Sequence, residues 1–136
     1  MTNTFVNEKP ASAIPDSLWN LVGREPTDVD LVSTTELLVR VRSFAPGTVF
    51  ANHFHTTFDE IFIGLTGTLT VWLGESDRRE ISPSVTVTCA RQQHHYIANN
   101  TDAVATIVII KSPNNADDST LVEWHPPVAK TTEAAQ

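Results

Sequence analysis

Between residues 36 and 111 the chain repeats one pattern, in which short runs rich in Val, Ile, Thr and Phe alternate with turn-forming residues. Such runs are typical of β-strands, and no stretch here has the hydrophobic period of a helix of useful length. We predict seven strands, near residues 36–44, 49–54, 59–64, 68–73, 85–89, 94–98 and 104–111. This number of short strands predicts an all-β sandwich or barrel.

The sequence predicts one barrel domain with an extension at each end. Its 136 residues are enough for a single hydrophobic core. Residues 1–35 contain three prolines and an apolar cluster around Trp19, which predicts an ordered arm that packs on the body. We assign residues 36–114 to the β-barrel, and residues 115–136 to a C-terminal extension that ends in a loose tail.

The charge distribution does not favour nucleic acid as a partner. The formal net charge is −7, and most of the acidic excess lies at the two ends of the chain. Residues 1–35 carry five acids against two bases, and residues 115–136 carry four acids against one base. Phosphate backbones would be repelled on average by such a protein.

Membrane insertion and export are not expected either. The longest apolar run, residues 104–110, is interrupted by Thr106 and is far shorter than the roughly 20 residues of a membrane span. The first 11 residues are polar, unlike a secretory signal. Cys89 is the single cysteine, so no internal disulfide can form, and a reducing, cytoplasmic location fits best.

Histidines and one glutamate form the pattern that carries chemistry. His53 and His55 are separated by one residue, and residues two apart on a β-strand point to the same face. Glu60 follows five residues later, so a bend can return its carboxylate to the two imidazoles. A fourth ligand can come from His94 or His95 on a later strand. Three nitrogens and one oxygen suit Fe, Mn, Ni, Cu or Zn.

This segment resembles the first signature of the cupin superfamily at every fixed position. The signature places a glycine before a His-x-His pair, and a glutamate and a second glycine after it. In this chain the matching residues are Gly47, His53, His55, Glu60 and Gly67. The resemblance covers about residues 36–112 and leaves the two ends unexplained.

The second cupin signature is looser and is matched when His95 is its histidine, because Asn99 then stands at the required spacing. Adjacent residues on a strand point to opposite faces, so only one of the two neighbouring histidines can enter the barrel. The spacing favours His95 over His94. The chain departs from the family at Ala90 and Gln92, where Pro and Gly are expected.

The resemblance implies a double-stranded β-helix, or jelly roll, that binds one divalent metal per chain in its open mouth. The implied ligands are His53, His55, Glu60 and His95, of which Glu60 and His95 are the expected catalytic residues. Fe or Mn is favoured, and Zn, Ni or Cu is possible. Single-domain cupins commonly pair, so we expect a homodimer in which the arm around Trp19 covers a neighbouring sheet edge.

Residues that share a strand face with the ligands are the candidates for the substrate pocket. The candidates found this way and on a neighbouring strand are Phe62, Ile97, Ala51 and Cys89. Such a lining is largely apolar and favours an uncharged or aromatic substrate. Arg40 and Arg42 alternate with valines, and we expect them to face solvent; with the parity inverted they could hold a carboxylate.

Few side chains other than the ligands can carry a proton, which favours chemistry done by the metal with dioxygen. We therefore predict a metal-dependent oxidoreductase, similar to cupins that act as dioxygenases, which oxidises or oxidatively cleaves a small, largely apolar organic molecule. One alternative is a non-redox Lewis-acid enzyme, as in cupins that act as polyketide cyclases, isomerases or lyases. A second alternative is a non-catalytic barrel that holds a ligand with the same residues.

Overall fold

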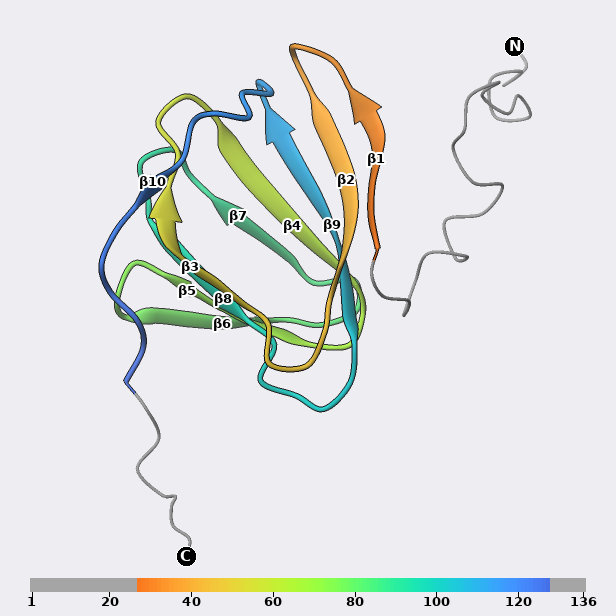
Figure 1. The fold of residues 1–136 in the computed structure, drawn as a ribbon, viewed down its shortest axis with the longest axis vertical. Helices are drawn as coiled ribbons and strands as arrows, with labels where there is room; N and C mark the ends of the chain where they lie inside the picture. Colours follow the sequence, from red (N-terminus) through yellow and green to blue (C-terminus); the bar gives the residue numbers. More distant parts are fainter. Residues whose placement is uncertain (1–26, 128–136) are drawn as a thin grey trace, which may run out of the picture.

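The computed structural model describes residues 27–127, and every regular element in this range is a β-strand (Figure 1). The strands are β1 (Asp28–Ser33), β2 (Leu38–Phe44), β3 (Val49–Phe54), β4 (Asp59–Thr66), β5 (Leu69–Leu73), β6 (Asp77–Ile81), β7 (Thr86–Cys89), β8 (His95–Ala98), β9 (Ala105–Ser112) and β10 (Thr120–Leu121). Within the described range, no helix is long and apolar enough to span a membrane.

The strands form two antiparallel sheets that face each other across the core (Figure 1). Sheet A has the strand order β1-β2-β9-β4-β7, and sheet B has the order β10-β3-β8-β5-β6. Consecutive strands cross repeatedly from one sheet to the other, which is the topology of a jelly roll. The all-β jelly roll expected from the sequence is therefore confirmed.

Each of the seven predicted strands corresponds to an observed strand, and three further strands were not predicted. The three are β1, β6 and β10, which include one outermost strand of sheet A and both outermost strands of sheet B. Outermost strands need little apolar surface and are commonly charged, which weakens their sequence pattern. β6 reads Asp-Arg-Arg-Glu-Ile, and β10 has only two residues, both exposed.

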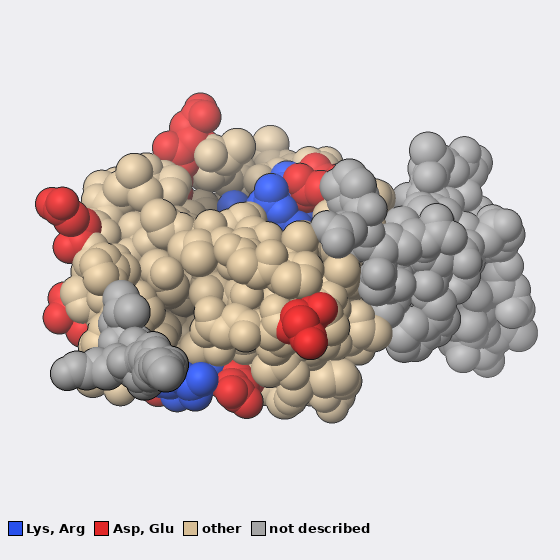
Figure 2. Space-filling view, turned by 60° about the horizontal axis from the view of Figure 1, so that its bottom comes forward, with Lys and Arg blue, Asp and Glu red and all other residues tan. Residues whose placement is uncertain are grey.

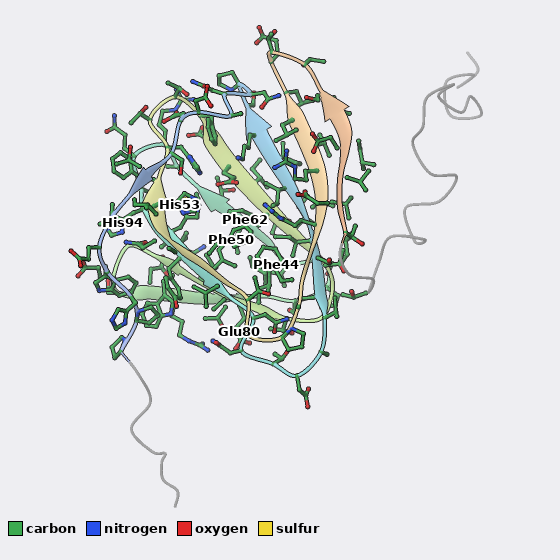
Figure 3. The ribbon with its side chains drawn as sticks, viewed as in Figure 1. Phe44, Phe50, His53, Phe62, Glu80 and His94 are labelled. Atoms are coloured by element: carbon green, nitrogen blue, oxygen red, sulfur yellow. The ribbon has the colours of Figure 1, made fainter. Side chains whose placement is uncertain are left out.

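The space between the sheets is filled by apolar side chains from both of them. Sheet A contributes Phe44 and Phe62, and the ring of Phe50 from sheet B lies 4.7 Å from that of Phe44. Figure 3 shows these three rings grouped between the sheets, with His53 nearby. The polar groups of the candidate site therefore stand directly beside the core.

A bulge in β3 decides which of its side chains point inward. Phe50 pairs with Ile97 of β8 and His53 pairs with His95, so β3 spans three residues where β8 spans two. The extra residue reverses the alternation, so that Phe50 and His53 both face the interior. Ala51 is consequently exposed on the outer face, and the expectation that it lines the pocket is wrong.

The outer face of sheet A is also apolar. The register of β2, β9 and β4 places a set of partly buried aliphatic side chains on this face: Val39, Ile61, Ile63, Val108 and Ile110. The apolar arm around Trp19, expected to cross to a partner, lies outside the described residues.

The homodimer expected from the sequence stays a prediction. We expect the full chain to sediment as a dimer at micromolar concentration, because an outermost strand presents unpaired backbone groups that a partner chain can cover. Analytical ultracentrifugation over a dilution series measures this directly. A monomer across the whole series would contradict the prediction.

A second prediction concerns Gly64, where β4 passes close to the β6–β7 connection. A Cβ atom on Gly64 would lie 2.1 Å from the carbonyl oxygen of Ser82, and Ser84 donates its N–H to the Gly64 carbonyl. We expect Gly64→Ala to lower the free energy of unfolding by about 3 kcal/mol, because backbone has to move. Gly74→Ala is the control. A φ of +70° would be strained for alanine, but nothing lies within 4 Å of the added Cβ atom, so this substitution should cost about 1 kcal/mol. Equal losses in urea denaturation would refute this account.

Candidate metal centre and its cavity

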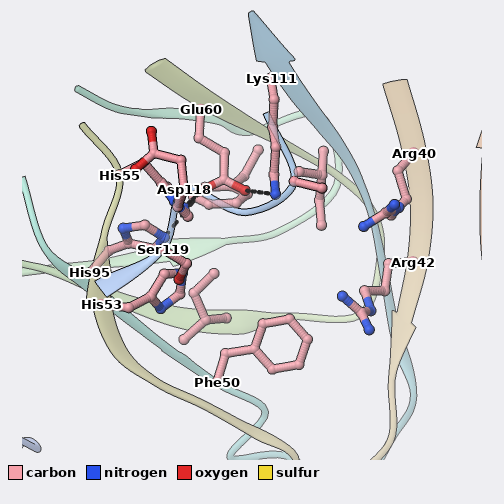
Figure 4. Close-up of a pocket in the computed structure, with 14 residues that line it drawn as sticks. Arg40, Arg42, Phe50, His53, His55, Glu60, His95, Lys111, Asp118 and Ser119 are labelled. Carbon is pink, nitrogen blue, oxygen red and sulfur yellow. Dashed lines mark hydrogen bonds and ion pairs between the residues drawn. The ribbon is translucent and has the colours of Figure 1, made fainter. Parts of the chain in front are cut away.

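Four residues from both sheets meet at one end of the interior (Figure 4). His53 lies on β3, His55 follows that strand, and His95 lies on the neighbouring β8. Glu60 reaches the same point from β4 of the opposite sheet. One nitrogen or oxygen ligand atom from each of the four lies within 4.8 Å of the others. The structure thus brings together the four residues that the sequence singled out.

The Glu60 carboxylate is the focus of the group. Its Oε1 atom lies 3.1 Å from Nε2 of His55 and 3.2 Å from Nε2 of His95. Burial acts to raise the pKa of Glu60, but hydrogen bonds from His55 and His95, which their Nε2 atoms donate when protonated, outweigh it and lower that pKa to about 2. Glu60 is therefore an ionised carboxylate at neutral pH, as a metal ligand must be.

The second ring nitrogen of each ligand histidine, Nδ1, is engaged by a hydrogen bond. Nδ1 of His53 lies 2.7 Å from the Ala51 carbonyl oxygen, and Nδ1 of His55 lies 2.5 Å from the Asp118 carbonyl oxygen. A carbonyl oxygen only accepts hydrogen bonds, so these two Nδ1 atoms carry protons. Each Nε2 atom of the neutral rings then has a free lone pair, which is the usual arrangement of a metal-binding histidine.

His95 is held by Cys89 in the same way. Sγ of Cys89 lies 3.1 Å from Nδ1 of His95 and 3.2 Å from the carbonyl oxygen of Gln93, so the thiol can donate to Gln93 and accept from His95. Burial, together with the nearby charge of Glu60, raises the pKa of the thiol to about 12, so it stays protonated. Cys89 lies behind His95 and does not line the cavity, contrary to expectation.

This donor set fits a divalent cation. With protons on the Nδ1 atoms, the Nε2 lone pairs of His55 and His95 point at a carboxylate oxygen, and only a proton or a cation between them makes that arrangement favourable. Burial lowers the pKa of His53, with a further contribution from His95, which favours the neutral ring that metals bind. Three imidazole nitrogens and one carboxylate oxygen suit Fe, Mn, Ni, Cu or Zn.

A cavity of about 170 Å³ opens beside the four residues. Phe62 and Ile97 line it, as expected, together with Phe50 and Ile109. Phe50 occupies the inward position that was assigned to Ala51, because of the bulge in β3. This side of the cavity is apolar.

The expectation of a largely apolar lining is wrong for the remaining wall, which contains Arg40, Arg42 and Lys111. The two arginines were expected to face solvent because they alternate with valines. The outer face of sheet A is itself covered, with Val41 fully buried, so hydrophobicity does not distinguish the two faces of β2. Lys111 was missed, although it follows Ile109 at the strand period and pairs with Glu60.

The segment after β9 closes one side of the cavity and was not predicted to take part. The Asp118 carboxylate accepts hydrogen bonds from the backbone N–H of Thr56, at 2.9 Å, and of Thr57, at 2.6 Å, and from both hydroxyl groups. Desolvation opposes these hydrogen bonds, but together they hold the pKa of Asp118 well below its ordinary value. The Asp118 carbonyl, as described above, orients His55, so this segment is fastened to the candidate centre.

His94 takes no part in the group of ligands. Its Nδ1 atom lies 3.0 Å from the side-chain amide of Asn52, away from His53 (Figure 3). His95 faces inward, which is the choice that the sequence spacing favoured.

Comparison with known proteins agrees with this geometry. Residues 40–111 match the family model described as Cupin domain, which is more than half of the chain. The chain belongs to the cupin family. No curated protein matches it.

Solved structures of similar fold include proteins with different activities. An uncharacterized conserved protein with a double-stranded beta-helix domain, from Klebsiella pneumoniae, is 20% identical with a TM-score of 0.67, covering 83% of this chain and 99% of that one. An oxalate oxidase in complex with glycolate is 21% identical with a TM-score of 0.59, covering 70% and 53%. A sugar phosphate isomerase from Silicibacter pomeroyi is 19% identical with a TM-score of 0.61, covering 71% and 65%. At these identities the similarity shows the fold alone.

The neighbouring histidines provide a matched test of the metal centre. We expect one divalent metal per chain in the purified protein, and we expect His95→Ala to lower metal affinity by about tenfold or more, because it removes an inward-facing nitrogen. His94→Ala should retain the metal. Elemental analysis after dialysis measures both, and a metal that depends on His94 but not on His95 would show that the ligand set is wrong.

Proposed function

We propose that this cupin is a metal-dependent oxidoreductase that oxidises or oxidatively cleaves a small organic molecule with dioxygen. The observation that carries the proposal is the composition of the cavity wall. Beside the four ligand residues, the wall holds cationic and apolar side chains, together with Ala116, Asp118 and Ser119. A wall of this kind binds and encloses a molecule but supplies little acid–base chemistry.

Different side chains of the cavity would bind the metal and exclude water. His53, His55, Glu60 and His95 would hold the metal, and four ligands leave room for a substrate in a coordination sphere of six. When bound, Fe(II) or Mn(II) supplies the one-electron chemistry through which dioxygen can react with an organic molecule. The apolar side of the cavity excludes bulk water from that reaction.

The described lining offers few groups that could exchange a proton with a substrate. The Asp118 carboxylate is occupied by hydrogen bonds from Thr56 and Thr57, as described above. A guanidinium group is not a proton carrier near neutral pH, which leaves Arg40 and Arg42 out of acid–base chemistry. This shortage favours metal-centred oxidation over a lyase or isomerase reaction that depends on a positioned proton carrier.

A non-redox Lewis-acid enzyme is the second candidate, and Lys111 is the observation that favours it. Its ammonium nitrogen lies 4.0 Å from Oε2 of Glu60 and faces the cavity, where it could deliver a proton to a substrate oxygen. Proteins of similar fold are named for both kinds of chemistry, one as an oxalate oxidase and another as a sugar phosphate isomerase.

Reconstitution with different metals separates the two candidates. We expect chelator-treated protein to consume dioxygen after loading with Fe(II) or Mn(II), when it is screened against small enols, phenols and organic acids in an oxygen electrode. Zn(II), which has no redox chemistry, should not restore the activity. His95→Ala controls for metal free in solution. Product formation that continues undiminished without oxygen, with Zn(II) fully active, would assign the protein to the Lewis-acid branch.

A further inference from the structure

We propose that Arg40, Arg42 and Lys111 form a carboxylate-binding wall, and that the substrate is a small organic acid with a second oxygen group directed at the histidine and glutamate ligands. This inference rests on the proposed function, because it names the substrate class of the same site. It replaces the uncharged, apolar substrate that the sequence favoured. We call the three residues the cationic wall.

The two arginines of the cationic wall stand across the cavity from the histidines, whereas Lys111 lies beside Glu60. Arg40 and Arg42 lie two residues apart on β2, so both project inward, and Lys111 lies on the adjacent β9. Figure 4 shows the two guanidinium groups pointing into the open space, with His53 and His95 on the other side. On the face shown in Figure 2, one group of Lys and Arg side chains lies in a hollow with an acidic side chain beside it, and a second basic group lies at the lower edge. A ligand in the cavity can therefore contact both sides.

Acidic residues on β1 compensate only part of this charge. Nε of Arg40 lies 2.6 Å from Oδ1 of Asp30 and 3.4 Å from Oδ1 of Asp28, and Nη2 of Arg42 lies 3.4 Å from Oδ2 of Asp28. The Asp28 and Asp30 side chains are 49% and 39% exposed, so solvent screens them. Lys111 lies 4.0 Å from Oε2 of Glu60, and the carboxylate of Asp118 also lines the cavity. Positive charge is therefore concentrated at Arg40 and Arg42, whose own partners are solvated, whereas Glu60 would be a ligand of the metal on the other side.

Arg42 is oriented for a planar ligand. Its guanidinium carbon lies over the Phe50 ring, 4.7 Å from the ring centre, so a cation–π contact helps to hold the group in place. The N–H groups at its edge remain directed along the plane, and one of them faces Asp28. Guanidinium edges match carboxylates, which accept two parallel hydrogen bonds.

The cost of keeping these charges at the cavity also indicates a ligand. The side chains of Arg40, Arg42 and Lys111 are only 26%, 32% and 18% exposed, and partly buried cations lose hydration. The register places Asp28 opposite Arg42 and Asp30 opposite Arg40 on the same face of sheet A, so β1 offsets part of this cost. An incoming carboxylate would replace the lost water with charge-assisted hydrogen bonds. A neutral molecule would not.

The test compares an acid with its neutral amide. The full-length protein is loaded with Zn(II), which is redox-inert, and titrated calorimetrically with lactate, lactamide and inorganic phosphate. We expect lactate to bind at least about tenfold more tightly than lactamide, and Arg42→Gln to weaken lactate binding by about tenfold or more while leaving lactamide unchanged. Arg42→Lys keeps the charge but loses the planar guanidinium edge. Its affinity for lactate should lie between those of the unchanged protein and Arg42→Gln.

Arg79→Gln is the matched control, because Arg79 is an exposed arginine on β6 that pairs with Asp77 and lies outside the cavity. It should bind lactate like the unchanged protein, and thermal unfolding verifies that each variant is folded. Equal binding of lactate and lactamide, lactate binding that is indifferent to Arg42→Gln in a folded protein, or no lactate binding up to about 10 mM would overturn the proposal. Phosphate that binds more tightly than lactate through Arg42 would also overturn it, in favour of a phosphorylated substrate.

The outcome is independent of the reaction. Binding to the zinc-loaded protein requires neither dioxygen nor turnover, so a failure here leaves the oxidoreductase proposal standing with a different substrate class. Conversely, an absence of oxygen uptake with Fe(II) or Mn(II) would leave the carboxylate preference measured here intact.

Discussion

The meeting of Glu60 from one sheet with three imidazoles from the other is the contact around which the site is arranged. A buried carboxylate is costly unless it is paired, and the side chain of Glu60 is only 6% exposed. Its Oε1 atom faces the Nε2 atoms of His55 and His95, whose Nδ1 atoms are engaged on the far side. This arrangement is favourable when a positive charge lies between the Glu60 carboxylate and the imidazoles. A divalent ion bound there would supply that charge.

The hydrogen-bond partners of the Nδ1 atoms fix the orientation of the three imidazole rings. One partner is the Ala51 carbonyl at the β3 bulge, one is the Cys89 thiol on β7, and one is the Asp118 carbonyl in the segment after β9. These partners belong to three separate parts of the chain, yet each fixes one ring. The order of the segment around Asp118 is thereby linked to the centre, since the same residue also binds the turn at Thr56 and Thr57.

Sequence reasoning succeeded where a residue's role depends on local spacing. The apolar runs and turns located seven strands, and the His-x-His and glutamate spacing found the four residues that the structure brings together. It failed where the outcome depends on pairing between strands. The extra residue of β3 is visible only against β8, and it exchanged Ala51 for Phe50 in the cavity. The prediction for Arg40 and Arg42 was wrong because both faces of β2 are partly buried. Their alternation with valines therefore does not show which set of side chains faces the interior.

The misplaced arginines change the chemistry that the cavity favours, because charge acts over longer distances than apolar contact. In a small space of low dielectric, a wall of three cations stabilises an anion far more than it would in water. A divalent metal held by three neutral imidazoles and one carboxylate adds further positive charge on the opposite side. The apolar residues between the two sides exclude water and so reduce screening of both. The apolar lining, taken from the sequence as a sign of an uncharged substrate, therefore strengthens the preference for an anionic one.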